Sequence, residues 1–182
     1  MKTIYALGKN RIKCSAVTVG KFDGVHCGHR FLLELLSKEE KLTKIVFTFK
    51  PLDGSPIKND RKLCNDAEKI ELLSAFSPDI TIIYPFGRKQ SQMSPKRFVK
   101  EILIRKLGMK KLFVGPDFCF GKHGRGDVAM LERMAEKYGF DLIVPDKIEF
   151  EGEAISSTRI RKEIEAGNLE NAEKMLGHSL KA

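Results

Sequence analysis

The residues best placed to do chemistry lie in one stretch, GKFDGVHCGH, from Gly20 to His29. An apolar strand pattern ends there, the chain turns at an Asp-Gly pair, and a helical pattern begins. His26 and His29 are three residues apart, so they share a face in the first turn of a helix. Gly28 leaves room for a phosphate to approach the N–H groups of the helix N-terminus. We therefore predict a phosphate-binding turn, with helix capping or zinc binding by the histidines as the alternatives.

A second segment with chemical potential is ISSTRIR, which ends at Arg161. Its hydroxyls, among them Ser157 and Thr158, stand where a helix begins and can bind a phosphate while capping that helix. Arg161 lies one turn further on and can reach the same anion with its two-pronged guanidinium group. An ordinary Ser/Thr cap followed by a basic helix face would give the same pattern.

A third segment, VGPDFCFG, runs from Val114 to Gly121 and leads into the glycine-rich stretch KHGRGD. Acidic and aromatic residues such as Asp117 and Phe118, placed after a strand, suit a planar ring with hydrogen-bonding edges. A surface loop without a ligand is the alternative.

The elements that must position these segments alternate between strands and helices, which is typical of an α/β fold with a parallel sheet. Strands are predicted over 16–22, 44–49, 79–84, 111–115 and 141–144. Helices are predicted over 28–41, from 65 or 66 to 76, from 94 or 95 to 107, and over 127–138, followed by two short helices capped by Ser157 or Thr158 and by Asn168. We predict a Rossmann-like, doubly wound sheet of about five strands in a single domain over residues 1–182. The loops after the first, second and fourth strands should meet at one rim.

The composition narrows the class of protein. A chain of 182 residues has the length of one domain, and 33 Lys and Arg against 24 Asp and Glu give a formal charge of +9. Such a surface attracts anions, so a basic nucleic-acid-binding module remains an alternative, although no readable nucleic-acid motif is present. The four cysteines have spacings of neither a disulfide framework nor a zinc site. We expect a cytoplasmic monomer with reduced thiols, no metal-ligating side chains, no membrane segment and no nucleic-acid partner.

Taken together, the three segments resemble one family, the adenylyltransferase module of the bacterial bifunctional riboflavin kinase/FAD synthetases. The motifs G-x-FDGVH-x-GH, VG-x-DF-x-FG and SST-x-x-R of that family stand here at 20–29, 114–121 and 156–161. The resemblance covers nearly the whole chain and implies a nucleotidyltransferase fold built around an H-x-G-H signature.

The resemblance also implies roles for individual residues. It implies that His26, His29 and Arg161 are catalytic. The nucleotide- and flavin-binding positions that match the family are Phe22, Asp23, Gly24, Gly28, Phe49, Pro51, Asp117, Phe118, Ser157 and Thr158.

Two departures from the family pattern stand out. The family's Phe-x-Pro-His-Pro stretch reads Phe49-Lys50-Pro51-Leu52-Asp53 here, which bears on the flavin side of the site. We expect the loop 50–62 to form that side. The residues given also lack the family's riboflavin kinase domain, so we expect no phosphorylation of riboflavin.

The implied reaction is transfer of AMP from ATP, with Mg²⁺, to FMN, which yields FAD and pyrophosphate. The FMN phosphate is largely dianionic at neutral pH because its second pKa is near ~6, so it needs no general base. Alignment of two anions and stabilisation of charge are then the main catalytic requirements. The alternative within the same class is a related nucleotidyltransferase that acts on another phosphate acceptor.

Overall fold

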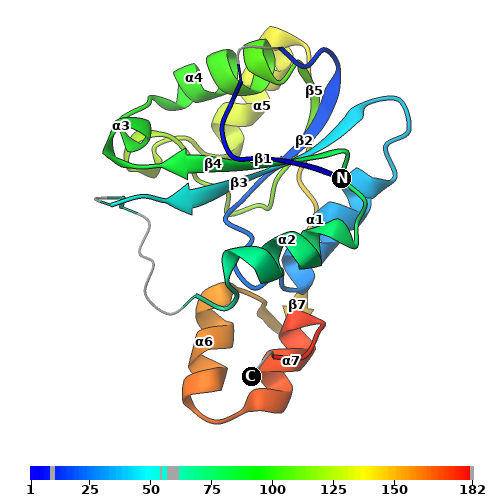
Figure 1. Ribbon diagram of the computed structural model, residues 1–182, viewed down its shortest axis with the longest axis vertical. Coiled ribbons are helices and arrows are strands. Elements are labelled where there is room, and N and C mark those ends of the chain that lie inside the picture. The colour runs from blue at the N-terminus through cyan, green and yellow to red at the C-terminus, as the bar shows by residue number, and fades with distance from the viewer. Residues whose placement is uncertain (9–10, 54, 57–61, 181–182) are drawn as a thin grey trace.

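A sheet of six parallel strands lies at the centre of the protein, with helices on both faces (Figure 1). The computed structural model describes residues 1–8, 11–53, 55–56 and 62–180. The strands of the sheet, in the order in which they lie side by side, are β1 (Lys2–Ile4), β4 (Ile80–Phe86), β3 (Thr43–Pro51), β2 (Ser15–Val19), β5 (Met109–Phe113) and β6 (Asp141–Ile143). The α/β, Rossmann-like architecture predicted from the sequence is confirmed.

The helices that pack on the sheet follow the strands in chain order. They are α1 (Cys27–Ser37), α2 (Asp66–Ser74), α3 (Arg88–Ser91), α4 (Pro95–Arg97) with its π-helical continuation η1 (Phe98–Lys106), and α5 (Val128–Tyr138). A short 3₁₀ turn, η2 (Lys122–Gly124), precedes α5. Within the described residues, no helix is both long and apolar enough to cross a membrane.

The two faces of the sheet bury different sets of side chains because side chains alternate along a strand. Val17, Ile45 and Leu112 pack on one face, in a cluster with residues of η1 and α5. Ala16 and Val46 point to the other face, where they meet the leucines of α1 and α2. Each face is thus covered by one pair of helices, as the near-continuous apolar strands require.

The strand order places a binding crevice at a definite point. Without β1, the strands lie side by side in the order β4, β3, β2, β5, β6. Moving outward from β2, the chain first adds strands on one side (β3, β4) and then on the other (β5, β6), so the strand order reverses at β2. Ligands of doubly wound sheets bind outside the carboxyl ends of the strands at such a reversal. Val17 of β2 pairs with Ile45 of β3 and with Leu112 of β5, so the loops after these three strands begin next to one another.

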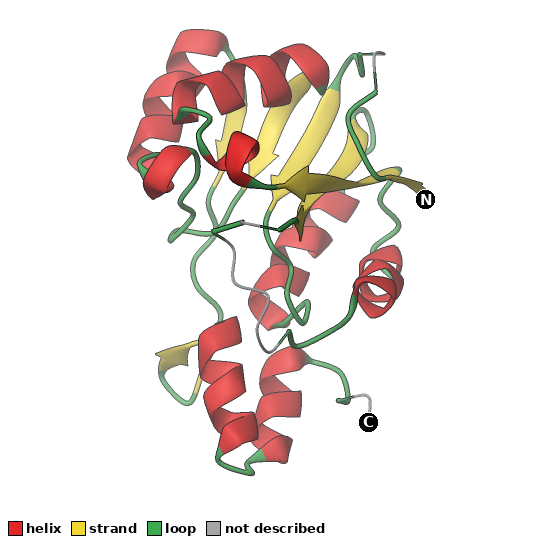
Figure 2. Ribbon diagram, turned by 60° about the vertical axis from the view of Figure 1, so that its left-hand side comes forward, coloured by secondary structure: helices red, strands yellow, loops and turns green. Residues whose placement is uncertain are grey.

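Two short strands and two short helices follow beyond this sheet. The hairpin of β7 (Glu149–Phe150) and β8 (Glu153–Ala154) leads into α6 (Ser157–Glu165) and α7 (Leu169–Leu176). Figure 2 shows α6 and α7 side by side beyond the end of the sheet. They form a separate small core of Ile160, Ala172, Met175 and Leu176.

The structure differs from the sequence prediction in several local features. The edge strand β1 and the β7–β8 hairpin were not predicted. The first strand ends at Val19 rather than at residue 22, and the cap of α6 is Ser156, whose hydroxyl accepts a hydrogen bond from the N–H of Arg159 at 3.2 Å, rather than Ser157 or Thr158. The prediction of one helix from 95 to 107 did not foresee its π-helical stretch.

A glycine just after η1 shows how closely two segments approach. Gly108 has a φ of +59°, and a Cβ there would lie 2.4 Å from the carbonyl oxygen of Ile12. Gly139, after α5, has a φ of +67° and nothing within 4 Å of its would-be Cβ. We expect Gly139→Ala to lower the free energy of unfolding by about 1 kcal/mol, the cost of a left-handed residue.

Gly108→Ala should cost about 3 kcal/mol, because steric overlap adds to the same backbone cost. Urea denaturation followed by circular dichroism measures both variants. Equal losses would show that the approach of residues 12 and 13 to Gly108 is not a packing constraint.

Candidate functional site

The turn between β2 and α1 has an unusual backbone. Phe22, Gly24 and Val25 have φ angles of +49°, +75° and +42°. Phe22 and Val25 are completely buried, and a positive φ is rare for residues of these types. Such conformations cost about 1–3 kcal/mol each and persist only where the surroundings hold them. The turn therefore depends on contacts from other parts of the chain.

Asp23 receives the most important of these contacts. Its Oδ1 accepts a hydrogen bond from the N–H of Leu63 at 3.0 Å, and its Oδ2 forms an ion pair with Nη2 of Arg161. The hydroxyl of Ser157 donates to the carbonyl oxygen of Asp23 at 3.0 Å. The structure thus brings together the first two sequence segments, the turn before α1 and the start of α6.

Gly24 is held by residues that the sequence analysis did not single out. Its N–H donates to Sγ of Cys64 at 3.2 Å, and its carbonyl oxygen lies 2.8 Å from Nε2 of His178. A Cβ at this position would lie 2.9 Å from the Cβ of Leu63. Gly24 is therefore required both for its φ and for this close approach.

The two histidines of the turn stack against each other. Their ring centroids are 3.7 Å apart with an interplanar angle of 23°, and the ring of Phe22 lies 5.0 Å from that of His29. His26 is the N-cap residue of α1. A Cβ at Gly28 would lie 3.3 Å from the His26 ring, so the glycine lets this ring lie over the backbone. The predicted shared face of His26 and His29 is present.

Burial determines the charge of this pair. It lowers the pKa of His26 to about 4, although the carboxylate of Asp23 acts in the opposite direction. Burial also holds the pKa of His29 well below its usual value, and the charges of His26 and Lys69 lower it further. Both imidazoles are neutral at pH 7. Among the described residues, neither Nδ1 atom has a hydrogen-bond partner, although both atoms are buried.

Aromatic rings line the neighbouring strand ends. They form a continuous row in which successive ring centroids lie 5.2 to 6.1 Å apart. In order, the row runs through Phe86, Phe49, Phe47, Phe98, Phe120 and Phe118. It includes two residues predicted for the flavin side, Phe49 and Phe118. Phe47, Phe98 and Phe120 are buried in the core, whereas Phe49, Phe86 and Phe118 are partly exposed at the two ends of the row.

Other predicted residues are not drawn into the same contacts. The side chain of Asp117 is 79% exposed and pairs with Nζ of Lys147 at 2.6 Å. Thr158 is exposed and lines a surface hollow with Arg159. Pro51 pairs with Phe86 in the register of β3 and β4. The predicted flavin-side loop 50–62 is described in part only, because positions 54 and 57–61 lie outside the described residues.

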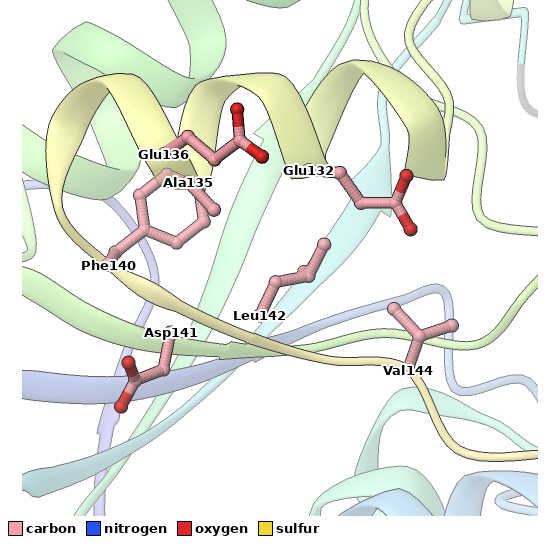
Figure 3. Close-up of a pocket in the computed structure, with 7 residues that line it drawn as sticks. All are labelled: Glu132, Ala135, Glu136, Phe140, Asp141, Leu142 and Val144. Carbon is pink, nitrogen blue, oxygen red and sulfur yellow. The ribbon is translucent and has the colours of Figure 1, made fainter.

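A hollow of about 570 Å³ between α5 and β6 is separate from this site (Figure 3). Its lining residues are Glu132, Ala135, Glu136, Phe140, Asp141, Leu142 and Val144. Three carboxylates and no basic side chain line it, which is unfavourable for a phosphate. We therefore assign the candidate site to the turn before α1, on chemical grounds rather than on the size of the hollow.

Comparison with known proteins identifies one family. The family model described as FAD synthetase matches residues 9–159. Two relatives named bifunctional riboflavin kinase/FMN adenylyltransferase, from Buchnera aphidicola subsp. Schizaphis graminum and Escherichia coli strain K12, are 35% and 34% identical to this chain. The alignments cover 90% and 89% of this chain and 54% of each relative, so the chain spans about half the length of the curated relatives that it matches.

Solved structures share the fold. A crystal structure described as a macrolide-efflux protein from Streptococcus pneumoniae superimposes with a TM-score of 0.79 at 25% identity, covering 98% of this chain and 62% of that one. Pantoate-beta-alanine ligase from Francisella tularensis gives a TM-score of 0.60 at 16% identity, with 92% and 77% covered. The second likeness bears on the fold alone.

The low pKa of His26 predicts how stability depends on pH. An unfolded histidine has a pKa near ~6.5 and is protonated first on acidification, so the free energy of unfolding falls as the pH drops from about 6.5 towards 4. At pH 4 the loss from His26 is about 3 kcal/mol, at about 1.4 kcal/mol per pKa unit. Burial of His29 acts in the same direction.

His26→Asn should flatten this pH dependence, because asparagine does not titrate and is a good N-cap residue. The matched control is His123→Asn, at an exposed histidine with a φ of +56° that asparagine tolerates. Urea unfolding between pH 4.5 and 7.5 measures both variants. An unchanged slope in the His26 variant would show that this ring is not buried in its neutral form.

Proposed function

The chain belongs to the FAD synthetase family, and from this membership we propose that it transfers the AMP group of ATP to the phosphate of FMN. The products are FAD and pyrophosphate. The observation that carries the proposal is the turn before α1, where the buried His26 and the half-buried His29, both neutral and both with a buried, unsatisfied Nδ1 atom, stand at a helix N-terminus. Unpaired donors and acceptors of this kind are suited to a ligand rich in phosphate oxygens.

The reaction is a substitution at phosphorus. An oxygen of the FMN phosphate forms a bond to the α-phosphorus of ATP, and the bond from that phosphorus to the bridging oxygen of the β-phosphate breaks. The electron pair leaves with pyrophosphate, so no oxidant or reductant is needed. Because the attacking phosphate already carries its charge, the protein has to align two anions and to stabilise the charge on the departing group.

His26 and His29 serve as neutral hydrogen-bond donors to ATP phosphate oxygens. A neutral imidazole has one N–H donor and one acceptor nitrogen. At the buried N-terminus of α1 such donors are preorganised and the backbone N–H groups add their partial positive charge. The neutral state also keeps the pair compatible with its own close stacking, which two imidazolium rings would oppose.

Asp23, Ser157 and Arg161 act together as the second part of the nucleotide site. Arg161 holds the carboxylate of Asp23 and stands close enough to the turn to share its guanidinium between that carboxylate and a phosphate. Thr158, in the first turn of α6, offers an exposed hydroxyl beside them. Gly28 gives the phosphates access to the backbone of the turn, whereas Gly24 is buried and holds the shape of the turn through its contacts with Cys64 and His178.

The flavin ring lies against the aromatic row. The isoalloxazine system is planar, with apolar faces and hydrogen-bonding edges, and rings such as Phe49 and Phe118 provide a matching surface for a face. Pro51 and the exposed Leu52 extend this surface at the end of β3. Asp117 lies in the loop that borders the ring.

Mg²⁺ enters with ATP. Among the described residues, no group of three or more His, Cys, Asp or Glu side chains could hold a metal. Mg²⁺ is usually bound by one or two carboxylates together with substrate phosphates and water. Both carboxylate oxygens of Asp23 are already engaged, by the N–H of Leu63 and by Arg161, so the ion would be held chiefly by the phosphates and would neutralise their charge.

We expect purified protein with ATP, Mg²⁺ and FMN to form FAD and pyrophosphate, because the acceptor phosphate needs no activating base. Separation of the flavins by liquid chromatography measures FAD directly. A parallel set of reactions replaces FMN with other phosphomonoesters. AMP transfer to one of these in preference to FMN would assign the site to a different acceptor, and no transfer at any FMN concentration would end the proposal.

His29→Ala should lower the rate of FAD formation by about 100- to 1,000-fold, the scale for loss of one preorganised donor. The matched control is His123→Ala, which removes an exposed imidazole. Initial rates at saturating ATP and FMN measure the effect, with circular dichroism to verify the fold. Near wild-type turnover of a folded His29 variant would remove this residue from the site.

A further inference from the structure

A lysine is buried beside the candidate site, and no partner for it is found among residues 1–8, 11–53, 55–56 and 62–180. Lys69 lies in the second turn of α2, and its side chain is only 8% exposed. The other buried residue of α2 is Leu73, four positions later, so the two lie on the same face of the helix. Lysine is almost never buried to this extent unless it is paired.

The arrangement of α1 and α2 places Lys69 near His29. These helices follow β2 and β3, which are adjacent and parallel, so both begin at the carboxyl edge of the sheet and pack on the same face of it (Figure 1). Leu73 packs in one cluster with Leu33 of α1. Lys69 lies one helical turn before Leu73, and His29 lies one helical turn before Leu33. Lys69 and His29 therefore both lie on the side of this leucine contact that is nearer to the start of the helices, where the site is.

The segment before α2 fixes this arrangement. The N–H of Leu63 donates to the carboxylate of Asp23, and Sγ of Cys64 accepts from the N–H of Gly24. These two hydrogen bonds attach the start of α2 to the turn that carries the histidines. Asn65 then caps the helix, and its side chain accepts from two backbone N–H groups. Lys69 is thereby held in position one helical turn beyond a rigid attachment.

The acidic residues of the first turn of α2 are engaged elsewhere. Asp66 pairs with Lys50 and Lys62, at 3.7 and 3.4 Å. Glu68 accepts from the backbone N–H of Asn65 at 2.8 Å. Within the described part of the chain, Nζ of Lys69 has neither an ion pair nor a hydrogen-bond partner. Its positive charge nevertheless acts at the site, since it contributes to lowering the pKa of His29.

We propose that Lys69 is a phosphate-binding residue of the nucleotide site, whose ammonium group contacts the polyphosphate held beside His26 and His29. This inference rests on the proposed function, because it assumes that the turn binds a nucleoside triphosphate. The two histidines are neutral and Arg161 is matched by Asp23, so these four side chains bring no net charge to a highly anionic ligand. Lys69 supplies a positive charge that no carboxylate of the described residues neutralises.

A purely structural role for Lys69 makes a different prediction. If the lysine stem only fills space between α1 and α2, methionine should replace it with no loss of ligand binding, since it is unbranched, apolar and adaptable. If the ammonium binds phosphate, the same substitution should leave the fold intact and weaken the binding of the anion. Binding and stability therefore separate the two roles.

The experiment uses inorganic pyrophosphate and ATP as probes, titrated with Mg²⁺ by calorimetry into the full chain. Lys69→Met should raise the Kd for pyrophosphate about 10- to 100-fold, the scale for loss of one charge-assisted contact. Lys69→Arg should restore part of the affinity. The matched control, Lys100→Met, removes the same charge from an exposed position on η1 and should bind as the wild type does.

A folded Lys69→Met variant with the wild-type Kd would overturn the inference, and so would an arginine variant that binds no better than the methionine variant. If Lys69→Met does not fold, Lys69→Gln takes its place with the same criteria. These titrations contain no FMN, so they are separate from the test of FAD formation. If the wild-type protein forms FAD and the Lys69→Met variant binds pyrophosphate as tightly as the wild type, the role of Lys69 is refuted and the proposed function stands.

Discussion

The ion pair between Arg161 and Asp23 joins segments 138 residues apart, and the geometry of the turn before α1 rests on it. The turn holds Phe22 and Val25 at positive φ, which neither residue adopts readily. Local sequence preferences would relax this backbone. The contacts from α6, from the residues before α2 and from His178 prevent that relaxation, and they hold the histidines at the end of the sheet where the strand order reverses.

Burial of the histidines has a second effect, on charge. A pair of rings 3.7 Å apart in a dry environment stays neutral, so it contributes directed hydrogen bonds instead of charge. Positive charge comes from side chains around the pair and from the helix N-terminus. This separation of direction and charge suits a reaction between two anions, since a cationic pair would bind phosphate strongly in the ground state as well as in the transition state.

Much of the fold and part of the site could be predicted from the sequence. The strands that became β2 to β6 each carry an apolar run bounded by turn residues, and the stacking of His26 on His29 follows from their spacing. The three-residue β1 gives no periodic signal because its pairing with β4 comes from 76 or more residues further along the chain. The turn of the β7–β8 hairpin has one sequence signal, Gly152, whose φ is +78° in the structure.

The site contacts that were missed have a common cause. None of Leu63, Cys64 and His178 lies in a motif, and their contacts with the turn depend on how distant segments meet in space rather than on local spacing. Asp117, by contrast, lies in a motif, yet its side chain pairs with Lys147 at the surface. A motif thus locates a segment at the rim of the sheet, whereas the direction of each side chain depends on tertiary packing.

The contact between His178 and Gly24 spans 154 positions of sequence, and those of Ser157 and Arg161 with Asp23 span nearly as many. A ribosome makes the sheet and its covering helices before it makes these three partners. The nascent chain can therefore bury its central strands early, while the turn before α1 stays without these anchors until the last helices emerge. During translation the scaffold of the sheet is thus complete before the contacts that hold the turn can form.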